Sequence, residues 1–430
     1  MKKINIAIIG LGQIGSRLYK EILSKKKDIR VKTGTDVNIL AISAKNINKK
    51  RNFQFNKNIF YRNPLKITQN KNINIIFELI GLSDGISKKI VETALKNKIH
   101  VVTANKALIA KHGDYLSQLA EINNVNLEFE AAVGGGIPIL RTIKDGLSTN
   151  KIHKVVGILN GTCNYILSEM ESSKSSFLNV LKRAQKLGYA ELQNPKSDLN
   201  GLDTLAKVRI LSALAFNKKI SNNKCLMDGI ENIGIEDINM ANKFGLRIKL
   251  LGITEIINNK LFERVHPCLI NKDNYIANIN GVMNAVILDG IPVGQSVLQG
   301  EGAGPGPTSS ALMSDLLSIL RGNIKFPFGI PCNKRNKISF YDKNNYSNSF
   351  YLRLEVKDKP GVLLSITNIF ARNKISIKNL IQNPDKKNNK ASIIIITHKN
   401  LEKNYSSLLS NLTKNKYIIK KPTFIRIENA

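Results

Sequence analysis

The chain has no tryptophan, only four cysteines, and no apolar run of the ~18–20 residues needed to cross a bilayer. The cysteines form no Cys-x-x-Cys pair, and they are too few to staple a chain of 430 residues. These absences exclude a membrane-spanning protein and a disulfide-stapled secreted domain, and they give no zinc-site spacing. Glycine interrupts the N-terminal apolar stretch, so we interpret it as a strand rather than a signal peptide and expect a cytoplasmic protein.

Acidic residues are also scarce, because 65 lysines and arginines face only 32 aspartates and glutamates and give a net charge of +33. A charge of this size raises the question of nucleic acid. The basic residues are spread along the chain, however, and aromatic residues do not interleave with them as a base-stacking surface requires. We therefore expect no nucleic-acid partner, although a basic surface attracts small anions.

Strands and helices are predicted to alternate in the N-terminal part. Apolar strands are expected at 4–9, 37–43, 73–80 and 100–103, with helices at 18–24 and 87–97. This alternation predicts an α/β fold with a Rossmann-type, doubly wound parallel sheet.

Beyond residue 130 the pattern changes to a mixed α+β one. Helices are expected at 139–147, 164–170, 177–187, 202–215 and 308–321, and strands at 155–159, 248–256, 261–270, 274–279 and 282–288. Residues 332–349, rich in Asn, Lys and Ser, are predicted to be a linker. From residue 350 a βαββαβ order follows, with strands at 350–356, 375–382, 391–397 and 423–428 and helices at 362–373 and 401–413.

A glycine motif follows the first predicted strand. Gly10, Gly12 and Gly15 have the spacing Gly-x-Gly-x-x-Gly between a strand and a helix, the context in which this motif binds a dinucleotide pyrophosphate. We therefore predict that the cofactor contacts Gly10, Leu11, Gly12, Gln13, Ile14 and Gly15.

The end of the second strand indicates which dinucleotide binds. NAD-specific chains carry an acidic residue there, which holds the ribose 2′-hydroxyl. This chain has Ser43 and Lys45 instead, with Arg51 nearby. A hydroxyl and two cations suit a 2′-phosphate, so NADP is predicted, and NAD stays open because lysine is common throughout the chain.

A second group of polar residues suggests the chemistry. Asp203 and Lys207 are spaced i, i+4 and share one helix face. Glu191 and Asp198 lie just upstream, between Gly188 and Gly201. An ordinary exposed ion pair would have the same spacing. Three carboxylates near one amine, however, would also hold a substrate ammonium group beside a catalytic lysine.

Read together, eight segments resemble the homoserine dehydrogenase family. They are 10–15, 78–81, 103–108, 130–138, 157–165, 188–191, 198–203 with Lys207, and 300–304. The resemblance implies NAD(P)-dependent interconversion of L-homoserine and L-aspartate 4-semialdehyde, in the biosynthesis of threonine, methionine and isoleucine. The C-terminal stretch resembles an ACT domain, an amino-acid-sensing module, through Asp358–Leu363.

The resemblance also implies roles for single residues. Lys207 is expected to be the acid/base on the substrate oxygen, and Lys106 a second catalytic lysine that meets cofactor and substrate. Glu191, Asp198 and Asp203 are expected to hold the substrate, and Thr103, Lys106, Gly188 and Gly302 to line the cofactor. Glu130, with the backbone carbonyls of Val133, Gly135 and Ile137, is similar to the family's monovalent-cation loop, usually a sodium site.

The implied organisation has three domains. The expected parts are a cofactor domain at 1–130 with a returning helix at about 300–325, a catalytic and dimerisation domain at 131–300, a linker at 332–349 and an ACT domain at 350–430. The family also suggests a homodimer or homotetramer. Threonine is the expected effector, with Asn379 and Gln382 facing its groove, and a dimerisation module without ligand is the alternative.

Two other functions compete with this one. A phosphorylating semialdehyde dehydrogenase would need a cysteine nucleophile, and Cys163 is the cysteine nearest the relevant loops; we interpret it as a packing residue. A non-catalytic binding regulator would not need Lys106 and Lys207.

Overall fold

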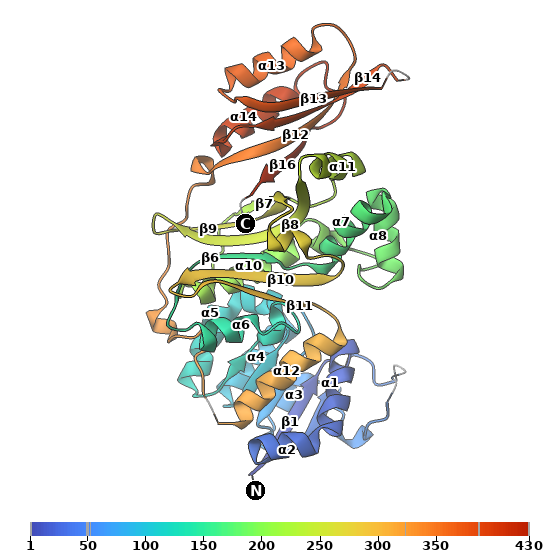
Figure 1. Ribbon diagram of the computed structural model, residues 1–430. Helices are drawn as coiled ribbons and strands as arrows, with labels where there is room; N and C mark the ends of the chain where they lie inside the picture. Colours follow the sequence, from blue (N-terminus) through green and yellow to red (C-terminus); the bar gives the residue numbers. More distant parts are fainter. Residues whose placement is uncertain (1, 49–50, 52, 323, 386–387, 429–430) are drawn as a thin grey trace. The chain divides into compact units, whose positions relative to one another are not determined.

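The computed structural model describes residues 2–48, 51, 53–322, 324–385 and 388–428 (Figure 1). The chain forms two compact units. The first comprises Met1–Gly161, Asp203–Lys224 and Met283–Ile338, and the second Thr162–Leu202, Cys225–Val282 and Ser339–Ala430. No helix among the described residues is both long and apolar enough to pass through a membrane.

The first unit contains a five-stranded parallel sheet. Its strands are β1 (Lys2–Ile9), β2 (Thr35–Ser43), β3 (Ile75–Glu78), β4 (His100–Thr103) and β5 (Leu127–Glu128), in the order β2-β1-β3-β4-β5. The helices between them are α1 (Gln13–Ser24), α2 (Lys26–Thr33), α3 (Pro64–Thr68), α4 (Ile86–Lys96) and α5 (Lys106–Ile122). Strand order reverses between β1 and β3, which is where ligands bind in doubly wound sheets.

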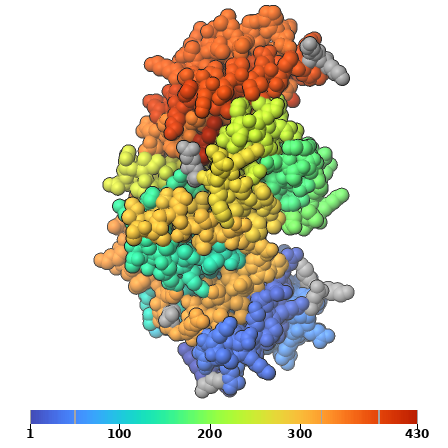
Figure 2. Space-filling model, in the orientation of Figure 1, coloured from blue at the N-terminus to red at the C-terminus, as the bar shows by residue number. Residues whose placement is uncertain are grey.

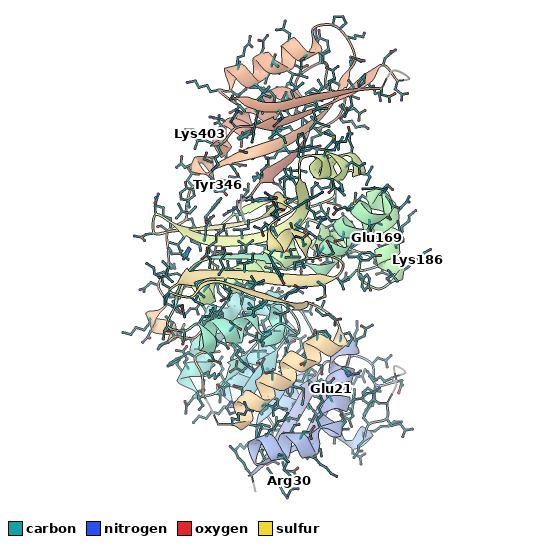
Figure 3. All side chains as sticks on the ribbon, viewed as in Figure 1. Glu21, Arg30, Glu169, Lys186, Tyr346 and Lys403 are labelled. Carbon is teal, nitrogen blue, oxygen red and sulfur yellow. The ribbon has the colours of Figure 1, made fainter. Side chains whose placement is uncertain are left out.

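Helix α12 (Pro305–Leu320) returns to this sheet from late in the sequence. Leu312 and Leu316 are fully buried in one apolar cluster with Leu18 and Ile22 of α1. Ser309 donates a hydrogen bond of 2.9 Å to Glu21 on α1, which is labelled in Figure 3. On the face shown in Figure 2, the amber surface of the residues near 300 borders the blue N-terminal surface. Helix α12 therefore packs against α1 of the first unit.

The rest of the first unit adds an antiparallel group of strands. β6 (Lys151–Ile158), β10 (Met283–Ile291) and β11 (Gly294–Glu301) pair in the order β11-β10-β6. Short α6 (Ile139–Arg141) precedes them, and α10 (Leu202–Ala215), which belongs to this unit from residue 203, is buried along most of its length.

The second unit combines helices with a larger sheet. Its helices are α7 (Gly161–Ser173), α8 (Phe177–Lys186), α9 (Lys196–Leu199), α11 (Ile235–Lys243), α13 (Val362–Arg372) and α14 (Glu402–Thr413). Its main strands are β8 (Leu246–Ile257), β9 (Lys260–Asn271), β12 (Ser347–Lys357), β13 (Ile377–Asp385), β14 (Lys390–Thr397) and β16 (Thr423–Ile427), in the order β8-β9-β16-β12-β14-β13. Short β7 (Leu226–Met227) pairs with β9 and β15 (Asn400–Leu401) with β12. The predicted βαββαβ order is confirmed from β12 to β16.

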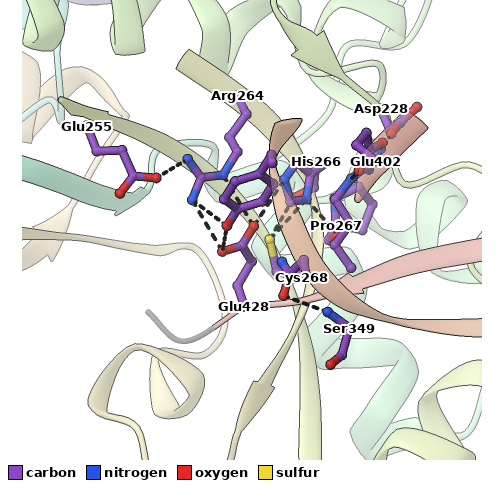
Figure 4. Close-up of polar contacts among 12 residues, drawn as sticks. Asp228, Glu255, Arg264, His266, Pro267, Cys268, Ser349, Glu402 and Glu428 are labelled. Atoms are coloured by element: carbon purple, nitrogen blue, oxygen red, sulfur yellow. Dashed lines mark hydrogen bonds and ion pairs between the residues drawn. The ribbon is translucent and has the colours of Figure 1, made fainter. Parts of the chain in front are cut away.

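Strand β16 lies between two parts of this sheet. It runs antiparallel to β12 and parallel to β9, with Arg426 opposite Cys268. Two buried arginines hold the junction (Figure 4). Arg426 binds Glu402 and Asp228, and Arg264, with 1% of its side chain exposed, binds Glu428.

One predicted strand is wrong. Residues 275–278 form a 3-10 helix, because the side chain of Asn274 accepts a hydrogen bond from the backbone of Ile276 and starts a turn there.

Candidate active site

The glycine loop has the conformation that a dinucleotide requires. Gly10 has φ +104°, and a Cβ there would lie 2.6 Å from the carbonyl oxygen of Leu79. A Cβ on Gly15 would lie 1.9 Å from the Gly10 oxygen, whereas a Cβ on Gly12 would meet nothing within 4 Å. Gly10 and Gly15 thus allow backbone segments to pack closely against each other, and Gly12 leaves open space at the start of α1. The cap of α1 makes no side-chain hydrogen bond, so the helix N-terminus is suited to an anion.

The loop after β2 adds positive charge beside this glycine turn. The backbone oxygen of Ser43 accepts a 2.8 Å hydrogen bond from Gly10, and Lys45 is exposed just beyond it. Arg51 donates to the carbonyl oxygens of Leu11, Ile47 and Asn46. Its guanidinium group therefore lies against the glycine turn, and no acidic residue occupies the end of β2.

Three predicted residues meet at one carboxylate. Asp203 lies at the start of α10, and its two oxygens bind two amines: Lys106 Nζ at 2.9 Å and Lys207 Nζ at 2.8 Å. Lys207 also donates a 2.5 Å hydrogen bond to the carbonyl oxygen of Leu159, just beyond the end of β6. The side chain of Lys207 is 10% exposed and that of Lys106 41% exposed. The pair is therefore not an ordinary surface ion pair.

The electrostatics of this group follow from its burial and charge. Burial works to raise the pKa of Asp203, but the ammonium groups of Lys207 and Lys106 outweigh it and hold that pKa well below its usual range. Asp203 is thus an anion that orients both lysines.

Asn160 belongs to the same group, and the sequence assigned it no role. Its amide donates a 2.9 Å hydrogen bond to Asp203. The available signal was its position directly after a predicted strand, where ligand-contacting residues gather.

The remaining substrate residues belong to the second unit. Gly188 has φ +78° and ends α8. The exposed Glu191 follows it, and the backbone of Glu191 accepts a hydrogen bond from Gln185. Asp198 is partly exposed in α9. Because these residues and Lys207 belong to different units, their grouping stays a prediction.

The predicted cation loop is a buried turn with one carboxylate. Glu130 is 3% exposed, and its oxygens accept hydrogen bonds from the backbones of Leu140 and Arg141 at 2.9 and 2.8 Å. Gly135 has φ +55°, and a Cβ there would lie 2.5 Å from the backbone of Gly302. Residues 135 and 302, predicted separately, therefore lie together.

More negative than positive charge is buried beside this loop. Glu130, Glu128 and Asp315 are three buried carboxylates, with Lys144 and Arg141 as their cations. Burial raises the pKa of Glu130, and burial together with the neighbouring carboxylates raises that of Asp315. No set of three or more His, Cys, Asp or Glu side chains that could hold a metal ion occurs within the described part of the chain. Any cation here would therefore depend on backbone oxygens.

Comparison with known proteins identifies the family. The family models for homoserine dehydrogenase and its NAD-binding domain match residues 138–317 and 10–130, and the ACT-domain model matches 350–416. A homoserine dehydrogenase from Helicobacter pylori is 37% identical over 429 residues, covering 100% of both chains. The chain belongs to the homoserine dehydrogenase family.

Further relatives agree with this assignment. The homoserine dehydrogenase of Neisseria gonorrhoeae is 36% identical over 439 residues, covering 100% of this chain and 99% of its own. A crystal structure of a homoserine dehydrogenase from Thiobacillus denitrificans superposes with a TM-score of 0.89 at 35% identity, covering 100% and 99%.

Homoserine dehydrogenases are oxidoreductases that act on a CH–OH group with a nicotinamide cofactor, so the predicted activity and fold class are confirmed. The alternative with a cysteine nucleophile is not supported. Cys163 is fully buried in α7, and its thiol donates to the backbone oxygen of Asp198.

Proposed function

We propose that Lys207 is the acid/base of homoserine dehydrogenase chemistry in this chain. The observation that carries this is its buried amine, fixed between Asp203 and the Leu159 carbonyl at the carboxyl end of β6. A bound nicotinamide cofactor would supply hydride to the carbonyl carbon when the aldehyde is reduced, and the substrate oxygen must then gain a proton. Lys207 donates it, and it accepts the proton when the alcohol is oxidised.

The zwitterionic substrate needs charges of both signs. Glu191 and Asp198 bind its ammonium group, Asp203 orients the reacting end, and Lys106 lies between substrate and cofactor. Thr103, Gly188 and Gly302 line the cofactor. We also propose the three-domain division predicted from the sequence.

We propose NADP as the preferred cofactor. Arg51 and Lys45 lie beside the glycine turn, where the 2′-phosphate of NADP would carry about two negative charges. We expect Arg51→Leu to raise KM for NADP about tenfold and to leave KM for NAD unchanged, since only NADP carries the phosphate. Steady-state kinetics with L-homoserine measure this.

Arg62→Leu is the matched control, because it removes one exposed arginine elsewhere in the first unit. An equal rise in KM for NADP and NAD in Arg51→Leu would contradict the proposal, and so would a preference of the wild type for NAD.

A monovalent cation, sodium in our proposal, would bind Glu130 and the carbonyl oxygens of Val133, Gly135 and Ile137. The unbalanced buried carboxylates support it, and hard oxygen ligands suit such an ion. Its charge would brace the loop against Gly302 and take no part in the reaction.

The ACT domain gives amino-acid control, and we propose threonine as the effector and a cytoplasmic homodimer or homotetramer as the assembly. Gly361 opens α13 with φ +82°, the type of turn at which an effector docks. The prediction that Asn379 and Gln382 face the same groove is wrong. Asn379 and Gln382 are three residues apart in uninterrupted register on β13, so they face opposite sides of the sheet and cannot line one groove together.

Single variants resolve which side binds. We expect L-threonine to inhibit the full chain. We expect one of the two variants Asn379→Ala and Gln382→Ala, but not both, to weaken this inhibition about tenfold, which corresponds to the loss of one or two hydrogen bonds. Inhibition curves at fixed L-homoserine measure this. Absence of inhibition in the wild type would contradict the effector assignment and leave catalysis untouched.

A further inference from the structure

The second unit contains a cavity that the proposed reaction does not use. It is lined by α7, α11, β8 and the turn at residues 280–281, all of which belong to this unit. Its volume is about 500 Å³, which lies within the range of about 300–1,000 Å³ that small-molecule sites have. Its lining includes polar and charged side chains, among them Tyr165, Ser168, Glu169, Lys174, Asn242 and Arg247; Glu169 is labelled in Figure 3.

Arg247 contributes hydrogen-bond donors that no neighbour uses. Its Nε binds Glu171 at 3.1 Å, and its Nη1 donates to Asn278 Oδ1 at 2.8 Å and to the carbonyl oxygen of Ala277 at 3.2 Å. These bonds fix the guanidinium group. Its Nη2 has no acceptor among the described residues, and the side chain is 20% exposed. Two N–H groups of Arg247 can therefore bind an acceptor in the cavity.

Two hydroxyl groups of α7 add further donors to the lining. Ser168 Oγ accepts a 3.3 Å hydrogen bond from the backbone of Gly281, which leaves its own proton to donate. The hydroxyl of Tyr165 makes no hydrogen bond to another residue in the part of the chain that the structure describes. The cavity thus offers several donors to one ligand.

The charges around the cavity favour an anion. Both carboxylates of the lining already have an arginine, since Glu169 pairs with Arg183 at 2.8 Å and Glu171 with Arg247 at 3.1 Å. Lys174 is exposed, and it belongs to none of the ion pairs found between described residues. Its charge is therefore not balanced by a carboxylate of the cavity.

A second unbalanced lysine lies directly behind the lining. Lys249 is 1% exposed and donates to Asn164 Oδ1 and Asn280 Oδ1 at 3.1 Å each, and to the carbonyl oxygen of Ile279. Asn280 itself lines the cavity. Burial and then the charge of Arg247 lower the pKa of Lys249 to about 7. A buried cation without a paired carboxylate is costly, and a bound anion would reduce that cost.

We infer that this cavity binds a small metabolite that carries a carboxylate or phosphate group. Lys174 and Lys249 supply the attracting charge, and the unused N–H groups of Arg247 donate to the oxygens of the ligand. Guanidinium N–H groups match the geometry of such oxyanions. The site does not depend on the proposed function.

Tyr165 connects the cavity to a loop described above. Its ring centroid lies 5.0 Å from that of Tyr189, which directly follows Gly188 and precedes Glu191 by two residues. All of these residues belong to the second unit. We expect an occupant of the cavity to restrict the motion of this loop; only the role of the loop in binding substrate rests on the proposed function.

Titration calorimetry of the full chain tests the site, with inorganic phosphate and succinate as separate probes. NADPH is present at saturation, so that neither anion binds at the glycine turn. We expect at least one probe to bind saturably, and Arg247→Gln to weaken it about tenfold or more, the loss of a charge-assisted hydrogen bond. The probe that binds more tightly shows whether phosphate or carboxylate is the natural group.

Lys186→Gln is the matched control, because it removes an exposed lysine at the end of α8, outside the cavity (Figure 3). We expect it to bind the anion as the wild type does. Ser168→Ala leaves the pair of Glu171 and Arg247 intact, and it should weaken binding about three- to tenfold, the effect of one neutral hydrogen bond. Equal affinity in the wild type, Arg247→Gln and Ser168→Ala would overturn the inference. An adventitious ion only, recognised by binding that does not saturate at ~10 mM, would do the same.

Hydrogen exchange at the backbone amides of residues 189–191 tests the contact with the loop. The amide of Tyr189 donates to the carbonyl oxygen of Ala184 at 2.9 Å, so its exchange reports local opening. We expect saturating anion to slow this exchange about two- to fivefold in the wild type and not in Tyr165→Leu, which lacks the ring. Unchanged exchange in the wild type with the anion bound would overturn the role of Tyr165. Failure of NADPH to bind would instead count against the cofactor assignment, and the anion titrations would then be read without it.

Discussion

Lys207→Ala is expected to lower kcat for L-homoserine oxidation by about 10²–10⁴, the usual effect of losing a general acid or base. Lys207 contributes a buried amine beside Asp203 and the Leu159 carbonyl. The glycine turn that we propose to bind the nucleotide lies elsewhere in the sequence, so we expect it to keep its structure. The dissociation constant of NADP is therefore expected to stay unchanged, and stopped-flow and steady-state kinetics measure the two effects separately.

Lys207→Arg is the sharper control. It retains a cation beside Asp203, but a guanidinium group does not release its proton in a protein. We expect the same loss of turnover as in the alanine variant. Recovery of most of the wild-type rate by arginine would mean that Lys207 supplies charge and not a proton, and normal turnover in the alanine variant would contradict its role altogether.

Arg264→Met is expected to cost about 3–5 kcal/mol of unfolding free energy, the usual result of removing one partner from a buried ion pair. Arg264 binds Glu428 at 3.2 Å, Glu255 at 2.5 Å and the hydroxyl of Tyr346 at 3.1 Å. Its removal leaves the buried Glu428 without its closest cation. Urea unfolding of the full chain, followed by circular dichroism, measures the change.

Lys420→Met is the matched control, because Lys420 is 70% exposed and pairs with Glu355 at 2.8 Å; exposed pairs contribute about 0–1 kcal/mol. Burial works to raise the pKa of Glu428, but Arg264 and then His266 hold it below its usual value. The stability that this provides is present above the ordinary glutamate pKa and is lost as pH falls through the lowered one. The difference in unfolding free energy between Arg264→Met and wild type should therefore narrow in acid. Equal losses of unfolding free energy in Arg264→Met and Lys420→Met at neutral pH would contradict the prediction.

Much of the site could be predicted because its signals are local. The spacing of Gly10, Gly12 and Gly15 reflects contacts within one turn, and Asp203 and Lys207 share a face by helical periodicity. The contact of Lys106 with Asp203 joins residues far apart in the sequence, and no periodicity encodes it. The resemblance to a family supplied that residue, and the structure supplied its partner.

The misplaced elements have equally physical causes. Residues 274–279 have the apolar content of a strand, but the Asn274 side chain competes for the backbone and forms a turn. Strand β11 was not predicted, because its sequence Gly294–Glu301 has few apolar residues, and among the described strands its neighbour is β10 alone.

The late return of α12 has a consequence for synthesis on the ribosome. Leu312 and Leu316 cover α1 and the first strands, yet they emerge long after residue 130. At translation rates of ~5–20 residues per second, the nascent sheet waits roughly ten to forty seconds for that cover. During this time an apolar surface is open to solvent, so the growing polypeptide should be a client of ribosome-associated chaperones.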